Sequence, residues 1–365
     1  MSARKAATAA LTLLLVTAGM PVVTAQTSWA AAQATTATAT ADETAASVAA
    51  AAAEAARNEV TRIAKSRLPA ELRTSAWNAL RSSLGDAAIT AWLAPGGGYD
   101  LAKQRLRDTR TRNRMFCERV AATHTAAFSP QVHAAASNAL RGTDADRAAF
   151  VKSGYAAAQV RDREARAADT AHQNEVSARE KDFIRALGVA DPGAEVRVAA
   201  QWALRAGATD TDVAEFFGYG WANGATLDLD GYRLRVADAE TRRHHGLSLL
   251  VQKAVAAEAA IPGAADAESA RADAVAAWRA VAGHAEAARL GWLADQAVAA
   301  AQARNWQDIA VAAQADGGPI WKNIAAPAVA NQGYWSQEEA EATVAVASWQ
   351  DILDQASRGE ERVKG

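Results

Sequence analysis

The sequence is poor in cysteine and in β-branched runs, and each shortage narrows the class of protein. Cys117 is the only cysteine among 365 residues, so no internal disulfide can form. The sequence places no histidine or lysine to activate its thiol, and we interpret Cys117 as a small buried apolar residue. Alanine dominates the composition, so intrinsic propensity favours helix over strand. We therefore predict an all-α protein that is long enough for two domains.

Motifs that fix catalytic groups or cofactors are also missing. The chain has no G-x-S-x-G, H-E-x-x-H or P-loop, and no G-x-G-x-x-G after a strand. His244 and His245 lie in a charged stretch, which we interpret as a solvated helix face rather than a metal pair. The segment from Asp228 to Gly231 is similar to a calcium loop, but its glycine comes too early, so we favour a turn. We predict no catalytic residue, no cofactor and no metal site.

Long apolar runs are confined to the N-terminus. Arg4 and Lys5 precede an apolar stretch from Ala6 to Val23, and small residues end it at Ala25. This pattern is typical of a cleaved signal peptide over residues 1–25. No later run of about 20 apolar residues is present, so we expect a secreted protein, extracellular or associated with the cell wall, without a transmembrane segment. The formal net charge of −2 is too small to indicate a partner.

The chain after the signal peptide shows an internal period of about sixty residues. Residues 26–64 are rich in alanine and threonine, and we expect a flexible leader that becomes helical near Thr44. The phrase NALR at 78–81 returns at 138–141, and WALR stands at 202–205. We predict three helical units over residues 65–257, with boundaries of about 65–127, 128–190 and 191–257.

Each unit carries the same local signals in the same order. A proline opens the first helix, a hydroxyl followed by an aspartate opens the second, and a glycine before an aromatic residue ends it in the left-handed conformation. In chain order the signals are Pro69, Pro130 and Pro192, then Ser83 with Asp86, Thr143 with Asp146 and Thr209 with Asp212, then Gly98-Tyr99, Gly154-Tyr155 and Gly220-Trp221.

The middle unit carries a family resemblance. Its segment ALRGTDADRAAFVKSGYAAAQVRD, residues 139–162, resembles the ALF short repeats of secreted actinobacterial proteins. The resemblance covers roughly residues 65–257 and is loosest in the first unit, where residues 95–98 are inserted. It implies a helical repeat scaffold without an assigned activity. In some relatives such repeats precede effector or toxin domains, which directs attention to the remaining third of the chain.

The C-terminal region, residues 258–365, is a duplication. Sliding it by 43 residues places one WQDI phrase, 306–309, on the other, 349–352, and aligns Trp278 with Trp321 without a gap. The copies span 278–320 and 321–363, and we expect each to be a helical hairpin with its tryptophans in a shared core. In the alternative interpretation, exposed tryptophans such as Trp292 and Trp335 stack on a glycan or peptide.

Four basic residues follow one helical face in the first unit. Lys103, Arg107, Arg110 and Arg114 are spaced i, i+4, i+7 and i+11, which predicts a stripe along one long helix. Such a stripe can bind an anionic polymer by counterion release. Pairing with neighbouring acids on a solvated face is the alternative.

These patterns predict a helical repeat array followed by a duplicated, tryptophan-rich pair of helical hairpins. The function they favour is a secreted, non-catalytic scaffold or binding module for a protein or a cell-envelope polymer. Two alternatives stay open: an exported effector, toxin or enzyme in the C-terminal third, and a polyanion binder that uses the basic stripe. No specific nucleic-acid partner is predicted.

Overall fold

The fold is known from a computed structural model that describes residues 29–169, 176–316 and 318–365, without the side chains of residues 29–46 and 316. The predicted signal peptide lies outside the described residues. All regular elements in the described ranges are helices, which confirms the all-α prediction. None of these helices is both long enough and apolar enough to cross a membrane.

The chain divides into two compact units, residues 1–43 and 44–365. In the first unit the described part, from Trp29, is helical and forms the beginning of α1 (Trp29–Lys65). Helix therefore begins earlier than the expected position near Thr44, where the second unit starts.

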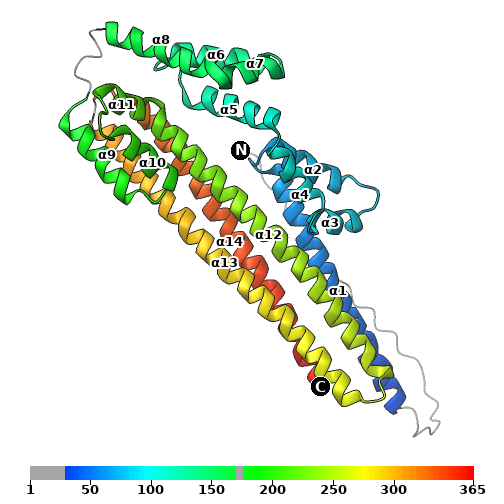
Figure 1. Ribbon diagram of the computed structural model, residues 1–365. Coiled ribbons are helices and arrows are strands. Elements are labelled where there is room, and N and C mark those ends of the chain that lie inside the picture. The colour runs from blue at the N-terminus through cyan, green and yellow to red at the C-terminus, as the bar shows by residue number, and fades with distance from the viewer. Residues whose placement is uncertain (1–28, 170–175, 317) are drawn as a thin grey trace, which may run out of the picture. The chain divides into compact units, whose positions relative to one another are not determined.

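Three long helices run side by side through the second unit (Figure 1). They are α12 (Trp221–Ala260), α13 (Ala267–Asp316) and α14 (Lys322–Lys364). Connections of only a few residues, including a 3₁₀ turn η4 (Ile261–Gly263), join them, so neighbours in sequence run antiparallel. Their apolar faces and the third predicted unit share one continuous core, so the C-terminal region packs as part of this unit.

Each copy of the duplication is one uninterrupted helix, so the expectation of a hairpin within each copy is wrong. The predicted helical faces of one copy lie on the same side of one continuous helix, because tryptophan and alanine alternate every seven residues. This period keeps a single seam facing the neighbouring helix. The buried seam residues are Trp278, Ala285, Trp292, Ala299, Trp306 and Ala313 on α13, and Trp321, Ala328, Trp335, Ala342, Trp349 and Ala356 beginning at the N-cap of α14.

Shorter helices form most of the three predicted units. The first contains α2 (Ala70–Leu80), α3 (Asp86–Leu93) and α4 (Gly98–Leu106), followed by α5 (Thr109–Thr123). The second contains α6 (Pro130–Arg141), α7 (Asp144–Ala149), α8 (Tyr155–Ala168) and α9 (Ala178–Ala190), and the third contains α10 (Ala194–Ala203), α11 (Asp210–Glu215) and most of α12. Cys117 on α5 is buried, as expected, and burial raises the pKa of its thiol.

Two of the three predicted capping boxes form, those at Thr143 and Thr209. The predicted box at Ser83 is wrong, because Gly85 is the N-cap residue of α3, with φ 56°. Asp86 therefore lies at the first helical position, where it pairs with Arg57. A glycine can adopt this left-handed conformation without steric cost, so it moves the helix start away from the serine.

The predicted glycine stops do not form, because the chain stays helical through Gly154 and Gly220. These glycines complete π-helical turns, η1 (Phe150–Gly154) and η3 (Phe216–Gly220), which lead directly into α8 and α12. A Cβ atom at Gly154 would lie 3.3 Å from the ring of Phe150. The missing side chain leaves room for the phenylalanine under the wide turn.

One aspartate closes the helix start of the second unit, and another that of the third. Asp162 accepts hydrogen bonds from the first amides of α6, and Asp228 does the same for α10, at 2.9–3.1 Å. Asp228 lies inside α12, so the turn predicted for residues 228–231 is wrong. The acidic residue satisfies donors at the positive end of another helix.

Candidate functional site

The structure places the predicted tryptophans in the core. Trp292 and Trp335 are only 2% and 1% exposed, so neither can stack on a ligand from the protein surface. Trp306 and Trp349 are equally buried. Burial of these rings supports the core interpretation and corrects the stacking alternative at those positions.

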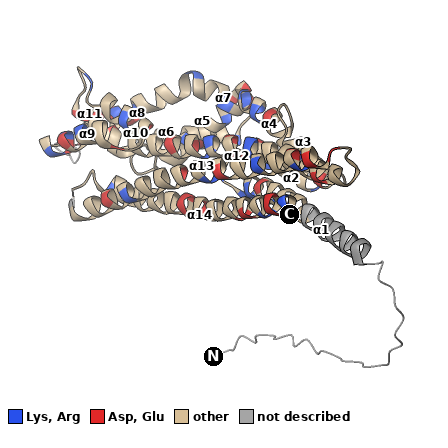
Figure 2. Cartoon of the chain, turned by 90° about the horizontal axis from the view of Figure 1, so that it is seen from below, with Lys and Arg blue, Asp and Glu red and all other residues tan. Residues whose placement is uncertain are grey.

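The predicted basic stripe is divided between two helices, because α4 ends at Leu106 and α5 begins at Thr109. Lys103 pairs with Asp238 at 2.5 Å, and Arg114 pairs with Glu71 at 2.6 Å. Arg107 and Arg110 are exposed, and Arg110 lies 3.8 Å from Asp144. Basic and acidic residues are interspersed along the described helices (Figure 2). The expectation of one continuous stripe is therefore wrong. Of its four residues, only Arg107 and Arg110 are exposed.

A groove of about 480 Å³ lies between the second and third units. Side chains from α5, α8, α10, α11, η3 and the beginning of α12 line it. Two ion pairs stabilise its wall: Arg163 of α8 forms a bidentate pair with Glu215 of α11 at 2.5 Å, and Arg205 contacts Asp212 at 2.9 Å. The first pair joins the two units directly, so the groove is an ordered feature of the fold.

The inner wall of the groove is a hydrogen-bonded aromatic cluster. The His124 ring stacks on the Tyr219 ring with centroids 4.0 Å apart, and the Tyr155 hydroxyl lies 3.2 Å from His124 Nε2. Gln159 donates to the hydroxyls of both tyrosines, at 2.9 and 3.2 Å. Burial lowers the pKa of His124 to about 4, so its ring is neutral near pH 7. The cluster therefore presents polar atoms and ring faces without a charge.

One tryptophan stands at the edge of this groove. Trp202 of α10 is 66% exposed, whereas every other tryptophan whose side chain the structure describes is buried or half-buried. The Arg205 guanidinium lies 4.2 Å from the ring centroid and holds the ring from one face. Val198, one turn earlier, is exposed beside it. In the sequence Trp202 only marks the position of the third WALR/NALR phrase. Nothing in the residues around it indicates that its ring is exposed.

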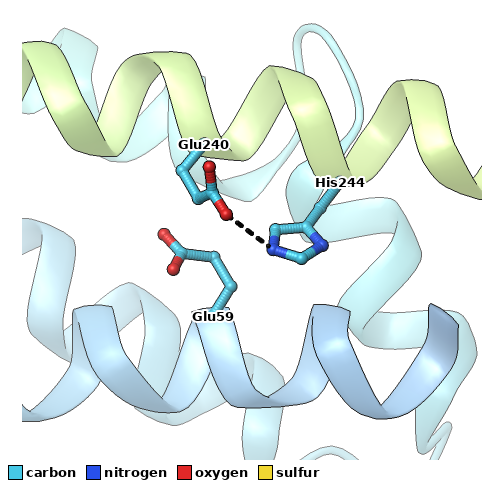
Figure 3. Close-up of side chains that lie close together, drawn as sticks. All are labelled: Glu59, Glu240 and His244. Atoms are coloured by element: carbon cyan, nitrogen blue, oxygen red, sulfur yellow. Dashed lines mark ion pairs between the residues drawn. The ribbon is translucent and has the colours of Figure 1, made fainter. Parts of the chain in front are cut away.

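A second polar site lies in the bundle of long helices (Figure 3). Glu59 of α1 faces Glu240 and His244 of α12, and His244 Nε2 is 3.1 Å from a Glu240 carboxylate oxygen. All three side chains are buried, at 5%, 3% and 5% exposure. The prediction of a solvated face at His244 is therefore wrong. Sequence reasoning missed the cluster because Glu59 is distant in sequence and α1 was expected to be a leader.

Electrostatics separate the two carboxyl groups of this cluster. Burial alone would raise the pKa of Glu240, but hydrogen bonds from His244 and Trp349 and the nearby charge of Arg243 lower it to about 2. Burial raises the pKa of Glu59 above its ordinary value despite its pairing with Arg62. A pocket of about 460 Å³ adjoins the cluster, and α1, α12, α13 and α14 line it. The site thus combines an ionised acid, a second acid and an imidazole.

Comparisons with protein-family models, with curated proteins and with solved structures find no match for this chain. The resemblance to ALF repeats stays a prediction from the sequence. The groove and the buried cluster therefore have to be interpreted from their own geometry and chemistry.

Proposed function

We propose that this protein is a secreted, non-catalytic binding module whose groove between the second and third units holds a carbohydrate chain of the cell envelope. The observation that carries the proposal is the exposed ring of Trp202, fixed by Arg205 at the edge of a groove of about 480 Å³. An exposed, immobilised aromatic ring loses little side-chain entropy on binding, which favours it as a ligand contact.

The chemistry of the groove suits a sugar. A pyranose ring has apolar C–H faces and a rim of hydroxyl groups, so it needs an aromatic surface and several polar side chains at once. Trp202 and Tyr219 supply aromatic rings, and Gln159 and Asn223 supply amides in the same groove. Arg119 has a buried Nε atom without a hydrogen-bond partner among the described residues. The groove thus offers aromatic rings and several polar side chains side by side, as a sugar requires.

Binding is favoured over glycoside hydrolysis by the state of the carboxyl groups in the groove. Hydrolysis generally uses a pair of carboxyl groups, one of which has a raised pKa and acts as the acid. Burial would raise the pKa of Asp212, but hydrogen bonds from Thr209 and Arg205 outweigh it and lower the pKa. Glu215 is held in its bidentate pair with Arg163. Two of the three carboxylates of the lining therefore stabilise the fold of the groove, and the third, Glu195, is exposed to solvent.

Sedimentation with insoluble polysaccharides tests this function. The chain from Gln26 would be mixed with purified cell-wall sacculi, with chitin and with cellulose, at low and at high salt. We expect retention on at least one of them at both salt concentrations, and at least a tenfold weaker affinity for Trp202→Ala, or about 1.4 kcal/mol. Trp77→Ala is the matched control, because Trp77 also lies beside an arginine, Arg81, but outside the groove.

Equal retention of both variants and the wild type would overturn the proposal. Retention that high salt abolishes would favour the second candidate, a polyanion site at the exposed Arg107 and Arg110. In that case the double variant Arg107→Glu, Arg110→Glu should lose binding while Trp202→Ala retains it. The two candidates thus give opposite results with the same assay.

A further inference from the structure

We propose that Glu59, Glu240 and His244 bind a divalent transition-metal ion, with one coordination position open to the adjoining pocket. One possible ligand atom from each side chain lies within 4.8 Å of the others. Glu240 and His244 are one turn apart on α12, and Glu59 approaches from α1 (Figure 3). Two packed helices therefore fix the three groups. The inference is independent of carbohydrate binding in the groove.

The spacing between His244 and Glu240 already fits a metal ion. A metal–ligand bond is about 2.0–2.1 Å long for nitrogen and oxygen donors. At the observed Nε2 to Oε1 separation of 3.1 Å, such bonds enclose an angle of roughly 100° at the ion, close to tetrahedral. The ion would replace the proton that His244 now shares with the carboxylate. The Glu59 oxygen lies within 4.8 Å of both atoms, so a shift of its side chain would bring it to bonding distance.

Each carboxylate keeps a lone pair for the ion. Glu240 Oε1 accepts from the Trp349 indole at 2.8 Å, and its second lone pair faces His244. The two oxygens of Glu59 accept from Arg62 at 2.8 and 2.9 Å, which leaves one lone pair on each. Trp349 and Arg62 would thus become the hydrogen-bonded support that orients the ligating carboxylates.

Charge also favours a cation between the acids. The carboxylates of Glu59, Glu240 and Glu341 outnumber the two guanidinium groups that pair with them, Arg62 and Arg243. The excess charge around the cluster is therefore negative, which favours a cation. The Arg62 guanidinium is itself 3.7 Å from Glu341, so its charge is partly balanced on the pocket wall. A donor set of one imidazole and two carboxylates suits Zn²⁺, Mn²⁺ or Fe²⁺ better than a site for Ca²⁺, which prefers six or more oxygens.

The adjoining pocket gives a small ligand access to the open coordination position of the metal. Its volume of about 460 Å³ accommodates water and a small ligand, and its wall includes the ring of Trp292 beside the cluster. Three protein ligands and a free position are the arrangement in which a metal binds an exogenous oxygen or nitrogen donor. A small molecule with a carboxylate or amine would be held there by direct coordination.

Metal titration of the full chain, after treatment with EDTA, tests the site. Isothermal titration with Zn²⁺ should show one tight site, and Ca²⁺ should not compete. Glu59→Gln and His244→Gln should weaken Zn²⁺ at least tenfold, whereas His245→Gln should leave it unchanged. His245 is the matched control, because it is adjacent in sequence but outside the cluster.

A spectroscopic test on the wild type avoids variants that fail to fold. Co²⁺ bound by one nitrogen and two carboxylates in four or five coordination gives a visible absorption stronger than that of the aqueous ion, and Zn²⁺ should displace it at one equivalent. An unchanged aqueous Co²⁺ spectrum, no Zn²⁺ heat, or an equal loss in His245→Gln and His244→Gln would each overturn the proposal. The cluster would then be a buried ion-pair network alone.

Discussion

Removing the carboxylate of Glu240 should destabilise the bundle strongly. Glu240 accepts from the indoles of Trp292 and Trp349 at 2.7 and 2.8 Å and from Arg243 at 3.1 Å. Glu240→Ala leaves two buried indole donors without an acceptor, at about 1–3 kcal/mol each. It also leaves the partly exposed Arg243 without its partner and creates a cavity. Because these costs are not additive, we expect a total loss of about 4–6 kcal/mol.

Urea unfolding followed by far-UV circular dichroism measures this loss. EDTA in every sample keeps metal binding out of the comparison. A chain of this length can unfold in more than one step, so intrinsic tryptophan fluorescence should be recorded as a second probe of the same transition. Coincident curves would allow the shift in midpoint to be converted into a free-energy difference through the m value.

Tryptophan-to-phenylalanine variants provide the matched control. Trp292→Phe and Trp349→Phe each delete a hydrogen bond to Glu240, whereas the Trp335 indole has no partner among the described residues. All three remove nearly the same buried volume. We expect the first two to cost about 1–2 kcal/mol more than Trp335→Phe. Equal costs at the three positions, together with a loss below about 1 kcal/mol for Glu240→Ala, would refute the role of Glu240.

Three further predictions concern pH, helix packing and the groove. His124 has a folded pKa of about 4 against an ordinary 6.5, so the unfolded chain gains a proton first, and stability should fall by up to about 3 kcal/mol as pH drops through this window. His124→Gln should remove that part of the pH dependence of urea unfolding. Gly359→Ala should lower the melting temperature, because its Cβ would lie 2.7 Å from the Trp278 ring, whereas Gly333→Ala on the same helix, with open space around it, should gain about 1 kcal/mol. N-bromosuccinimide should oxidise Trp202 before the buried tryptophans, and this modification should abolish polysaccharide retention; retention that survives it would contradict the assigned contact.

Local signals predicted local structure well, and their failures have local causes. The capping boxes at Thr143 and Thr209 form because each needs only residues three positions apart. The box at Ser83 fails because Gly85 offers the backbone a second way to begin the helix. The hairpins predicted in the duplicated region do not form. The two short helical patterns within each copy were interpreted as two helices, although they belong to one. The seven-residue alternation of tryptophan and alanine, present in the sequence, predicts one continuous helix per copy.

The candidate sites were harder to predict, since both depend on contacts between distant segments. Glu59 and Glu240 meet only because α1 packs along α12, and the charged residues around His244 indicated solvent instead. The position of Trp202 in the predicted unit was clear from the sequence. The spacing within one helix does not show which of its faces the neighbouring unit leaves exposed. Whether a side chain at the edge of one helical unit is buried depends on how the next unit packs against it.

Polar contacts to the tryptophans also explain how the duplicated helices keep their register. A seam in which tryptophan and alanine alternate every seven residues packs almost equally well after a slide of fourteen residues, so apolar packing alone leaves the axial position poorly defined. The carboxylates that accept hydrogen bonds from the indoles lie outside the duplicated sequence. Glu258 accepts from Trp278, Glu240 from Trp292 and Trp349, and Glu180 from Trp321.

A slide of α13 or α14 would therefore leave buried carboxylates without donors. Buried polar residues fix register in this way in coiled coils, at some cost in stability. We infer that the acids on α9 and α12 have this role here. A bundle with Glu180, Glu240 and Glu258 all replaced by leucine, which has no hydrogen-bond acceptor, should still be helical by circular dichroism. Cysteine crosslinks between α13 and α14 should then form at more than one axial offset, whereas a single offset would show that apolar packing is sufficient.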